Sequence, residues 1–492
     1  MPNSSGKSVS VFTLALMTVA SVMSLRGLPM MAAEGLSMIF YILFATFVFL
    51  LPAAMVSAEL GSAFSQSGGG VYTWVKEAFG PRWGFTAIWL QWIQNVVWYP
   101  TVLGFAAASL AYLVADPQLA DSGTFTGSVI IIIYLLATVV AMKGSTAVNA
   151  VTKYGVIVGT LIPALLIIIL GLLWIDQGNP IAFLAPGAAA GTAPHQHAHM
   201  RLFPHFTGFG SVAFLAGIVL LFAGVEVQAV QASAMKNPSR EFPAAMLLAS
   251  VCIVLVFLLG ALAVAVVVPA AEISLTAGLM QAFTILLDKF HLGFLTRVLG
   301  LCMAFGVIGS VMSWVTGPSR GLLQTAREGE MPPFMARINK AGAPVTLLLI
   351  QAVVVTVLAL LYFVMKNVSV AFFVLSAMTA TLYLAMYMLM FAAAIRLRRT
   401  RPDLPRAYKV PGGTVGMWGV AGLGFLGVCF AMIVGFFPPA NLPVGNPIFY
   451  VGLVAFGLIF FTGMPLIIQL FKKPSWMPSQ TGQNTTSHGD KI

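Results

Sequence analysis

The stretch TVASVMSLRGLPMMAAEG, from Thr18 to Gly35, places one arginine in the middle of a segment that is otherwise compatible with lipid. Apolar residues run from Val11 to Met31, and this is long enough for a helix to cross a hydrocarbon core of roughly 30 Å. Gly27 and Pro29 interrupt that helix, because glycine frees the backbone and proline lacks an amide donor and clashes one turn back. The segment is therefore predicted to be a broken transmembrane helix.

The break leaves the carbonyls near Ser24 and Leu25 without partners inside the helix. At bilayer depth, irregular backbone is stable only where protein buries it or where it lines a wet cavity. A charge such as Arg26 at the centre of a span costs about 2.5 to 3.5 kcal/mol on insertion scales. We interpret the break as half of a binding site. The alternative is that Arg26 snorkels to an interface or neutralises a buried acid in a kinked structural helix.

Composition defines the class of protein. Of the 492 residues, 59% are hydrophobic and only 8% are charged, whereas soluble domains carry about 25% charged residues. The mean hydropathy is +0.95. An all-α polytopic membrane protein is predicted, and a sizeable soluble domain is excluded. Cys252, Cys302 and Cys429 lie inside apolar runs, where they act as small hydrophobic residues, so no disulfide, metal site or cofactor is expected.

Twelve long apolar runs are predicted to be transmembrane helices. They lie near residues 11–33, 36–60, 84–113, 126–142, 147–175, 210–233, 243–267, 295–320, 344–365, 369–395, 413–437 and 447–471. This divides the chain into an N-terminal segment 1–10, a transmembrane domain 11–471 and a C-terminal tail 472–492. With an even number of spans, both termini are expected on one side of the membrane.

Basic residues gather in the loops on that side. Of the 25 Lys and Arg residues, the loops on the other side hold only Arg201, Lys289, Arg297 and Lys366. Cytoplasmic loops carry the excess of Lys and Arg, so both termini are predicted to be cytoplasmic. The net charge of +11 is then explained by topology, and no nucleic-acid partner is expected.

A second interrupted span lies near the middle of the chain. The sequence LFAGVEVQAV, from Leu221 to Val230, puts Gly224 and the acid Glu226 inside a hydrophobic helix. Two interrupted spans, each first in a group of five, indicate an inverted-repeat transporter whose substrate site lies at the membrane midplane. No residue-level similarity between spans 1–5 and 6–10 is visible, so this step depends on position alone.

Three longer stretches carry a family resemblance. SAELGSAFSQSGGGVYTWVKEAFGPRWGF (57–85) shows an acid, then Gly-Gly-x-Tyr, then Phe-Gly; MKNPSREFPAAM (235–246) follows span 6; and SWVTGPSRGLLQTAREGEMPPFMARINKAGAPV (313–345) ends span 8. Together with span 6, they resemble the amino acid, polyamine and organocation superfamily over roughly residues 10 to 470. The third stretch is most similar to bacterial glutamate:gamma-aminobutyrate exchangers.

The resemblance implies a LeuT-type fold, with spans 1–5 and 6–10 as inverted repeats, spans 1 and 6 unwound around the substrate, and spans 11 and 12 peripheral. It implies secondary active amino acid transport by alternating access in a bacterial inner membrane, without enzymatic activity. Exchange of the glutamate:gamma-aminobutyrate kind is the first choice, and proton-coupled uptake of an amino acid or polyamine is the alternative. The expected partners are small amino acids, membrane lipid and, as a candidate coupling ion, the proton. The oligomeric state stays open.

The candidate substrate-binding residues combine both breaks with one aromatic residue of span 8. They are Ser24, Leu25, Arg26, Gly27, Ala223, Gly224, Glu226 and Trp314. The resemblance gives Glu226 and Trp314 a role in gating or proton coupling. Many relatives have a small or aromatic residue where this chain has Arg26, so their substrate charge cannot be transferred to it. Because the breaks face each other in such a fold, Arg26 and Glu226 are expected to pair when the cavity is empty and to separate when a substrate carboxylate binds Arg26. A permanent structural ion pair is the alternative.

Three other patterns were weighed. Gly317, Ser319 and Gly321 spell G-x-S-x-G, but a hydrolase nucleophile of this kind follows a strand, and here a transmembrane helix precedes it. The alternating His195, His197 and His199 are better explained by a solvated loop than by a metal or pH-sensing site. In span 3, Gln91, Asn95 and Tyr99 share a helix face, which either lines the cavity or hydrogen-bonds to neighbouring helices.

Overall fold

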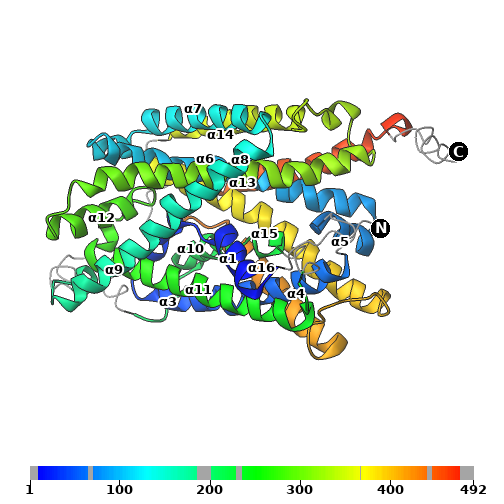
Figure 1. The fold of residues 1–492 in the computed structure, drawn as a ribbon, viewed down its shortest axis with the longest axis horizontal. Coiled ribbons are helices and arrows are strands. Elements are labelled where there is room, and N and C mark those ends of the chain that lie inside the picture. Colours follow the sequence, from blue (N-terminus) through cyan, green and yellow to red (C-terminus); the bar gives the residue numbers. More distant parts are fainter. Residues whose placement is uncertain are drawn as a thin grey trace, which may run out of the picture.

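The computed structural model describes residues 9–64, 70–184, 201–228, 235–365, 367–439 and 446–476. Within these ranges the protein is helical and contains no β-strand (Figure 1). The first five spans are built from α1 (Val11–Val22), η1 (Leu25–Gly27), α2 (Leu28–Ala32), α3 (Ser37–Ala45), η2 (Thr46–Leu50), α4 (Leu51–Ala63), α6 (Pro81–Leu113), α7 (Gly123–Met142), α8 (Ser145–Val156), η4 (Ile157–Leu161) and α9 (Ile162–Asp176). The short helices α5 (Gly70–Phe79) and η3 (Pro117–Asp121) connect them.

The remaining spans follow the same plan. They are η8 (Phe209–Val212) with α10 (Phe214–Leu221), α11 (Pro238–Val267), α13 (Leu295–Arg327), α14 (Val345–Val364), α15 (Val368–Thr400), α16 (Gly413–Val434) and α17 (Pro447–Leu470). The shorter η5 (Ala182–Leu184), η10 (Ala270–Glu272), α12 (Gly278–Lys289), η11 (Pro333–Ala336) and η12 (Pro474–Trp476) lie between or after them.

The predicted fold class is confirmed. The described residues contain 11 helices that are long and apolar enough to cross a membrane, and 12 when the bent pair Val11–Val22 and Leu25–Ala32 counts as one span. The His195–His199 segment and the tail from residue 477 onward lie outside the described residues.

Three spans are longer than the sequence predicted. The helices α6, α13 and α15 each contain 33 residues, about 50 Å at 1.5 Å per residue, which exceeds the hydrocarbon thickness. The sequence prediction ended span 8 at residue 320 and span 10 at residue 395, where charged residues interrupt the apolar run. The helices continue past these charges because water or headgroups, rather than lipid tails, surround their ends.

Spans 2 and 5 also differ from uninterrupted α-helices. Each contains a five-residue π-helical turn, Thr46–Leu50 and Ile157–Leu161, and a proline follows each turn, Pro52 and Pro163. Proline cannot donate to the carbonyl four residues back, so a widened turn accommodates it. The sequence analysis missed both turns because it judged these segments by hydropathy alone.

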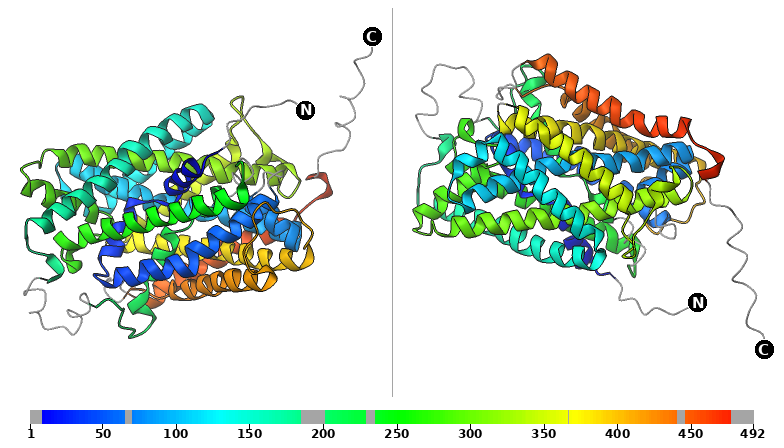
Figure 2. Two further views of the ribbon diagram at one scale, coloured as in Figure 1. Left: turned by 60° about the horizontal axis from the view of Figure 1, so that its bottom comes forward. Right: turned by 90° about the horizontal axis from the view of Figure 1, so that it is seen from above.

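Burial places α15, α6 and α10 at the centre of the bundle. Most residues of these helices are buried, whereas only a minority of α17 is buried. In Figure 1, α15 and α10 run between α6 and α13 on one side and α3, α4 and α11 on the other. Figure 2 shows α17 along the outer edge of the bundle. The polar groups of the central helices are therefore shielded from lipid.

Candidate functional site

The break in span 1 lies where the sequence predicted it. Helix α1 ends at Val22, and both Met23 (φ −67°, ψ 119°) and Ser24 (φ −136°, ψ 114°) are extended. The helix resumes in η1 and α2, bent by 49° from α1. Pro29 lies in the first turn of α2. Proline has no amide hydrogen to donate, and it is favoured in the first turn of a helix, where that hydrogen would have no partner in any case. The break presents Ser24, Leu25 and Arg26 inside the bundle.

The break in span 6 is also confirmed. Helix α10 ends at Leu221, and residues 225–228 form a short 3₁₀ turn. Between them, Gly224 has φ +115°, a conformation that strongly favours glycine. The described part of this segment ends at residue 228, so its continuation into α11 lies outside the described residues.

The two breaks lie side by side. A Cβ atom added to Gly27 would come within 2.2 Å of Leu221 Cδ1, so a larger residue at this position would have to displace the Leu221 side chain. A Cβ on Gly224 would lie 3.3 Å from the carbonyl oxygen of Ser21 and 3.4 Å from Trp314 Cζ2. The interrupted segments of the early and middle spans therefore meet beside α13.

A small cavity of about 50 Å³ lies between the breaks and helices α6, α13 and α15. The predicted residues Ser24, Arg26, Ala223 and Trp314 line it. Other side chains around it are Ser21, Gln94, Asn95, Trp98, Ser310 and Tyr383. Leu25 contributes with Arg26 to an adjoining cavity of about 20 Å³ against Gly159 and Gly306. Gly27 instead packs against Leu221, and the amide of Gly224 donates to the Tyr387 hydroxyl at 3.0 Å.

Arg26 is a buried cation without a counterion in the part of the chain that the structure describes. Its side chain is only 3% exposed, and no described residue forms a hydrogen bond or ion pair with its guanidinium. Its Nε is buried without a hydrogen-bond partner among the described residues. The guanidinium carbon lies 5.6 Å from the ring centre of Trp98 and 5.8 Å from that of Phe372. Aromatic faces offset part of the desolvation cost, but they leave the hydrogen-bonding capacity of Arg26 unused.

The expected ion pair between Arg26 and Glu226 is absent from the structure. The Glu226 carboxylate accepts hydrogen bonds from the hydroxyls of Tyr383 and Tyr387, and from Gln91 Nε2 at 3.1 Å. Glu226 is only 2% exposed. Three neutral donors therefore satisfy the hydrogen-bonding capacity of its buried carboxylate. The prediction considered only spans 1 and 6 and overlooked the donors that α15 and α6 bring to the acid.

The polar face of α6 both lines the cavity and hydrogen-bonds to a neighbouring segment, the two roles that the sequence left open. Asn95 and Gln94 line the cavity, whereas Gln91 connects α6 to Glu226. Tyr99 packs against Tyr134, with ring centres 5.0 Å apart. The face is thus divided along its length between the cavity and helix packing.

Tyr383 and Tyr387 of α15 are the main residues that the sequence analysis missed. They lie four residues apart in a helix that is apolar on most of its faces, and both hydroxyls point to Glu226. A tyrosine in an apolar helix gives little signal, because most are packing residues. Their four-residue spacing within span 10 was the one available indication.

The stretches that carried the family resemblance make contacts at one end of the bundle. Tyr72 of the Gly-Gly-x-Tyr motif donates to Glu328 at 2.5 Å, and Lys76 Nζ lies 2.8 Å from the same carboxylate. Burial would raise the pKa of Glu328, but hydrogen bonds from Lys76, Tyr72 and Gln324 together hold it below its ordinary value. At neutral pH Glu328 is therefore ionised and connects α5 to the end of α13.

Twelve spans with two interrupted helices meeting at a buried cavity define a membrane transporter of the broken-helix class. Comparison with known proteins agrees. The profile of the amino acid permease family matches residues 9–461, and the chain belongs to this family.

Several relatives with similar sequences are named as transporters or antiporters. The chain is 38% identical over 463 residues to an uncharacterized transporter of Legionella pneumophila, covering 94% of this chain and 97% of that protein. It is 31% identical over 465 residues to a glutamate/gamma-aminobutyrate antiporter of Lactococcus lactis, covering 94% and 90%. A probable agmatine/putrescine antiporter of the same species is 24% identical over 415 residues, covering 82% of each chain.

Proposed function

We propose that this protein exchanges amino acids that carry a carboxylate across the bacterial inner membrane, in the manner of a glutamate:gamma-aminobutyrate antiporter. The observation that carries the proposal is the buried guanidinium of Arg26, which has no hydrogen-bond or ion-pair partner among the described residues, at a cavity between the two helix breaks. A planar guanidinium can bind a carboxylate through two parallel hydrogen bonds. Both glutamate and gamma-aminobutyrate carry such a group, so one arginine can bind either partner of the exchange.

Arg26 also argues against a polyamine as substrate. A polyamine is a cation without a carboxylate, and it would enter a buried cavity that already holds an uncompensated positive charge. Like charges at close range in a medium of low dielectric repel strongly. The relative named as a probable agmatine/putrescine antiporter is more distant, in keeping with this argument.

Glu226 is the candidate acid for coupling. Its hydrogen bonds to Tyr383, Tyr387 and Gln91 place a carboxylate next to the cavity, where it can face a substrate ammonium group or take up a proton. The second use supports the runner-up function, proton-coupled uptake, because protonation of Glu226 would need no amino acid on the opposite side. The two functions therefore share a site and differ in their driving force.

The size of the cavity supports alternating access. Sites for small molecules commonly measure about 300 to 1,000 Å³, and the cavity between the breaks measures about 50 Å³. An amino acid can enter only when the surrounding helices move apart.

We propose that segments 1–10 and 472–492 are cytoplasmic and that residues 11–471 form the transporter domain.

Exchange can be distinguished from proton-driven uptake in proteoliposomes. Vesicles loaded with unlabelled glutamate or gamma-aminobutyrate are expected to take up labelled glutamate several-fold faster than empty vesicles, because a loaded carrier returns across the membrane more readily than an empty one. Equal uptake into empty vesicles, driven by a pH gradient, would favour the proton-coupled permease. No labelled amino acid uptake under either condition would contradict both.

Trp314 is expected to contact the substrate. It lines the cavity and packs edge-to-face against Trp98, with ring centres 6.3 Å apart. A tryptophan presents a rigid face to an aliphatic chain or an ammonium group. We expect Trp314→Phe to lower the apparent affinity for substrate about 3- to 10-fold, the equivalent of about 1 kcal/mol, without a loss of folded protein.

The matched control is Trp83→Phe, which changes an exposed tryptophan at the start of α6. Exchange rates and thermal melting of the purified variants are compared with wild type. If Trp314→Phe lowers the melting temperature and leaves affinity unchanged, Trp314 is a packing residue.

A further inference from the structure

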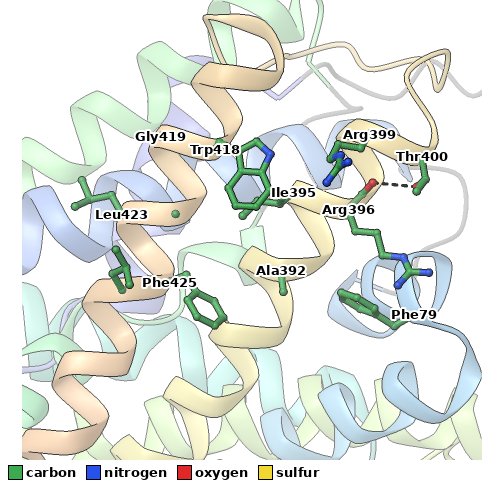
Figure 3. A pocket seen from close by; sticks show the side chains of 12 residues that line it. Phe79, Ala392, Ile395, Arg396, Arg399, Thr400, Trp418, Gly419, Leu423 and Phe425 are labelled. Carbon is green, nitrogen blue, oxygen red and sulfur yellow. Dashed lines mark hydrogen bonds between the residues drawn. The ribbon is translucent and has the colours of Figure 1, made fainter.

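A large hollow lies between α15 and α16, and none of its lining residues borders the cavity between the helix breaks (Figure 3). It measures about 1120 Å³, and apolar side chains form its walls. Trp418, Leu423 and Leu426 of α16 are exposed by 50%, 47% and 68%. Apolar side chains exposed on a transmembrane helix face lipid. We call this hollow the α15–α16 groove.

Two glycines of α16 keep the groove open. Gly419 and Gly422 line it, and a Cβ atom added to either would meet nothing within 4 Å. The helix surface is therefore recessed between Trp418 and Leu426. A recess of this kind fits an extended hydrocarbon chain lying along the helix.

One end of the groove carries two arginines. Arg396 and Arg399 lie one turn apart near the end of α15, and both are exposed. Figure 3 shows Arg399 next to Trp418 and Arg396 next to Phe79, and the Arg396 guanidinium carbon lies 5.0 Å from the Phe79 ring centre. Trp418 at the same end has the amphipathic character typical of the membrane–water interface.

These two arginines differ from their neighbours in having no acidic partner. Arg398 pairs with Glu59, Arg401 with Glu77, and Arg406 with Glu59. No described residue forms an ion pair with the side chain of Arg396 or Arg399. The same end of the bundle thus supplies carboxylates to three arginines and leaves the two that border the groove free for an external anion.

We infer that the α15–α16 groove binds an acidic phospholipid. Its phosphate would lie between Arg396 and Arg399, and its acyl chain would follow the recess at Gly419 and Gly422. The charge complementarity requires an anionic head group, and the apolar walls require a hydrocarbon tail. One ligand that meets both requirements, and that surrounds the protein, is a lipid such as phosphatidylglycerol.

The inference can be tested on the full chain, purified in a neutral detergent, by native mass spectrometry. Phosphatidylglycerol and phosphatidylcholine with the same acyl chains are titrated separately. Arg396→Gln/Arg399→Gln is expected to weaken phosphatidylglycerol binding about 30-fold, since each basic residue near a lipid surface contributes roughly fivefold. Phosphatidylcholine binding should change little. Gly422→Phe should weaken both lipids, because it fills the recess and leaves the charges in place.

The control is Arg337→Gln/Lys340→Gln, which removes two exposed charges from the segment around η11. Thermal melting of each variant reports whether it is folded. The inference is overturned if the control weakens phosphatidylglycerol binding as much as the groove variant does, or if Gly422→Phe leaves lipid binding unchanged. It is equally overturned if the groove variants convert a dimer into monomers without affecting bound lipid, because the groove would then be an interface between protein chains.

Discussion

Replacing Arg26 with methionine is expected to weaken the binding of carboxylate substrates strongly, to slow their exchange, and to leave the protein at least as stable as wild type. Arg26 is 3% exposed, and no described residue serves as its counterion. A hydrogen bond to a charged group contributes about 1.5 to 3 kcal/mol, so losing it should weaken carboxylate binding about 10- to 100-fold. A buried, unpaired charge costs several kcal/mol in folding, and methionine removes that cost while filling a similar volume.

Two further variants sharpen the test. Arg26→Lys keeps the charge but loses the planar pair of donors, so we expect partial transport. Arg297→Met removes an exposed arginine at the start of α13 and should leave exchange near wild type. Substrate affinity comes from exchange rates in proteoliposomes, and stability from thermal melting in detergent. Normal exchange by Arg26→Met would remove Arg26 from the site and contradict the proposed function.

The sequence predicted the parts of this site that depend on conflict with the lipid environment. Arg26, Gly27 and Pro29 are anomalous inside an apolar run, and the structure places the break there. Gly224 was likewise recognised as an interruption of an apolar helix, and it adopts a backbone conformation that favours glycine. Hydropathy alone was sufficient for the twelve spans, because every backbone polar group in a bilayer must be satisfied within a helix or a barrel.

The sequence could not predict which side chains meet across helices. The prediction of an ion pair between Arg26 and Glu226 was wrong. Tyr383 and Tyr387, which lie far along the chain, supply hydroxyl donors to the Glu226 carboxylate instead. Helix rotation determines such contacts, and in span 10 the apolar pattern surrounds the helix and does not specify a face. The π-helical turns and the lipid-facing groove depend on the same three-dimensional information.

Glu59 illustrates a charged residue whose role is structural. This acid belongs to the motif at the end of span 2, and its carboxylate lies 2.5 Å from Arg398 Nη1 and 3.0 Å from Arg406 Nε. It also accepts a hydrogen bond from the amide of Val410 at 2.7 Å. The side chains of Glu59 and Arg406 are 2% exposed and that of Arg398 is 9% exposed. The cluster connects α4 to the end of α15 and the loop that follows it.

We expect Glu59→Gln to destabilise the fold by about 3 to 5 kcal/mol, the usual cost of removing one partner from a buried ion pair. Glutamine preserves the size of the side chain but leaves two buried guanidinium groups without a counterion. The matched control is Glu77→Gln, which breaks the pair of Glu77 with Arg401, whose side chains are 30% and 48% exposed. An exposed pair contributes at most about 1 kcal/mol, so this variant should remain close to wild type.

Thermal melting in detergent, with exchange measured on the fraction that remains folded, separates stability from transport. Glu59→Gln should lower the melting temperature far more than Glu77→Gln does, while the folded fraction exchanges amino acids at a rate near wild type, because Glu59 does not line the cavity between the breaks. Equal, small shifts for the two variants would mean that water reaches Glu59 and that the cluster is not a buried one. Normal melting with lost exchange would instead assign Glu59 to the transport cycle, since the carboxylate would then be needed for movement of α4 against α15 and not for holding them together.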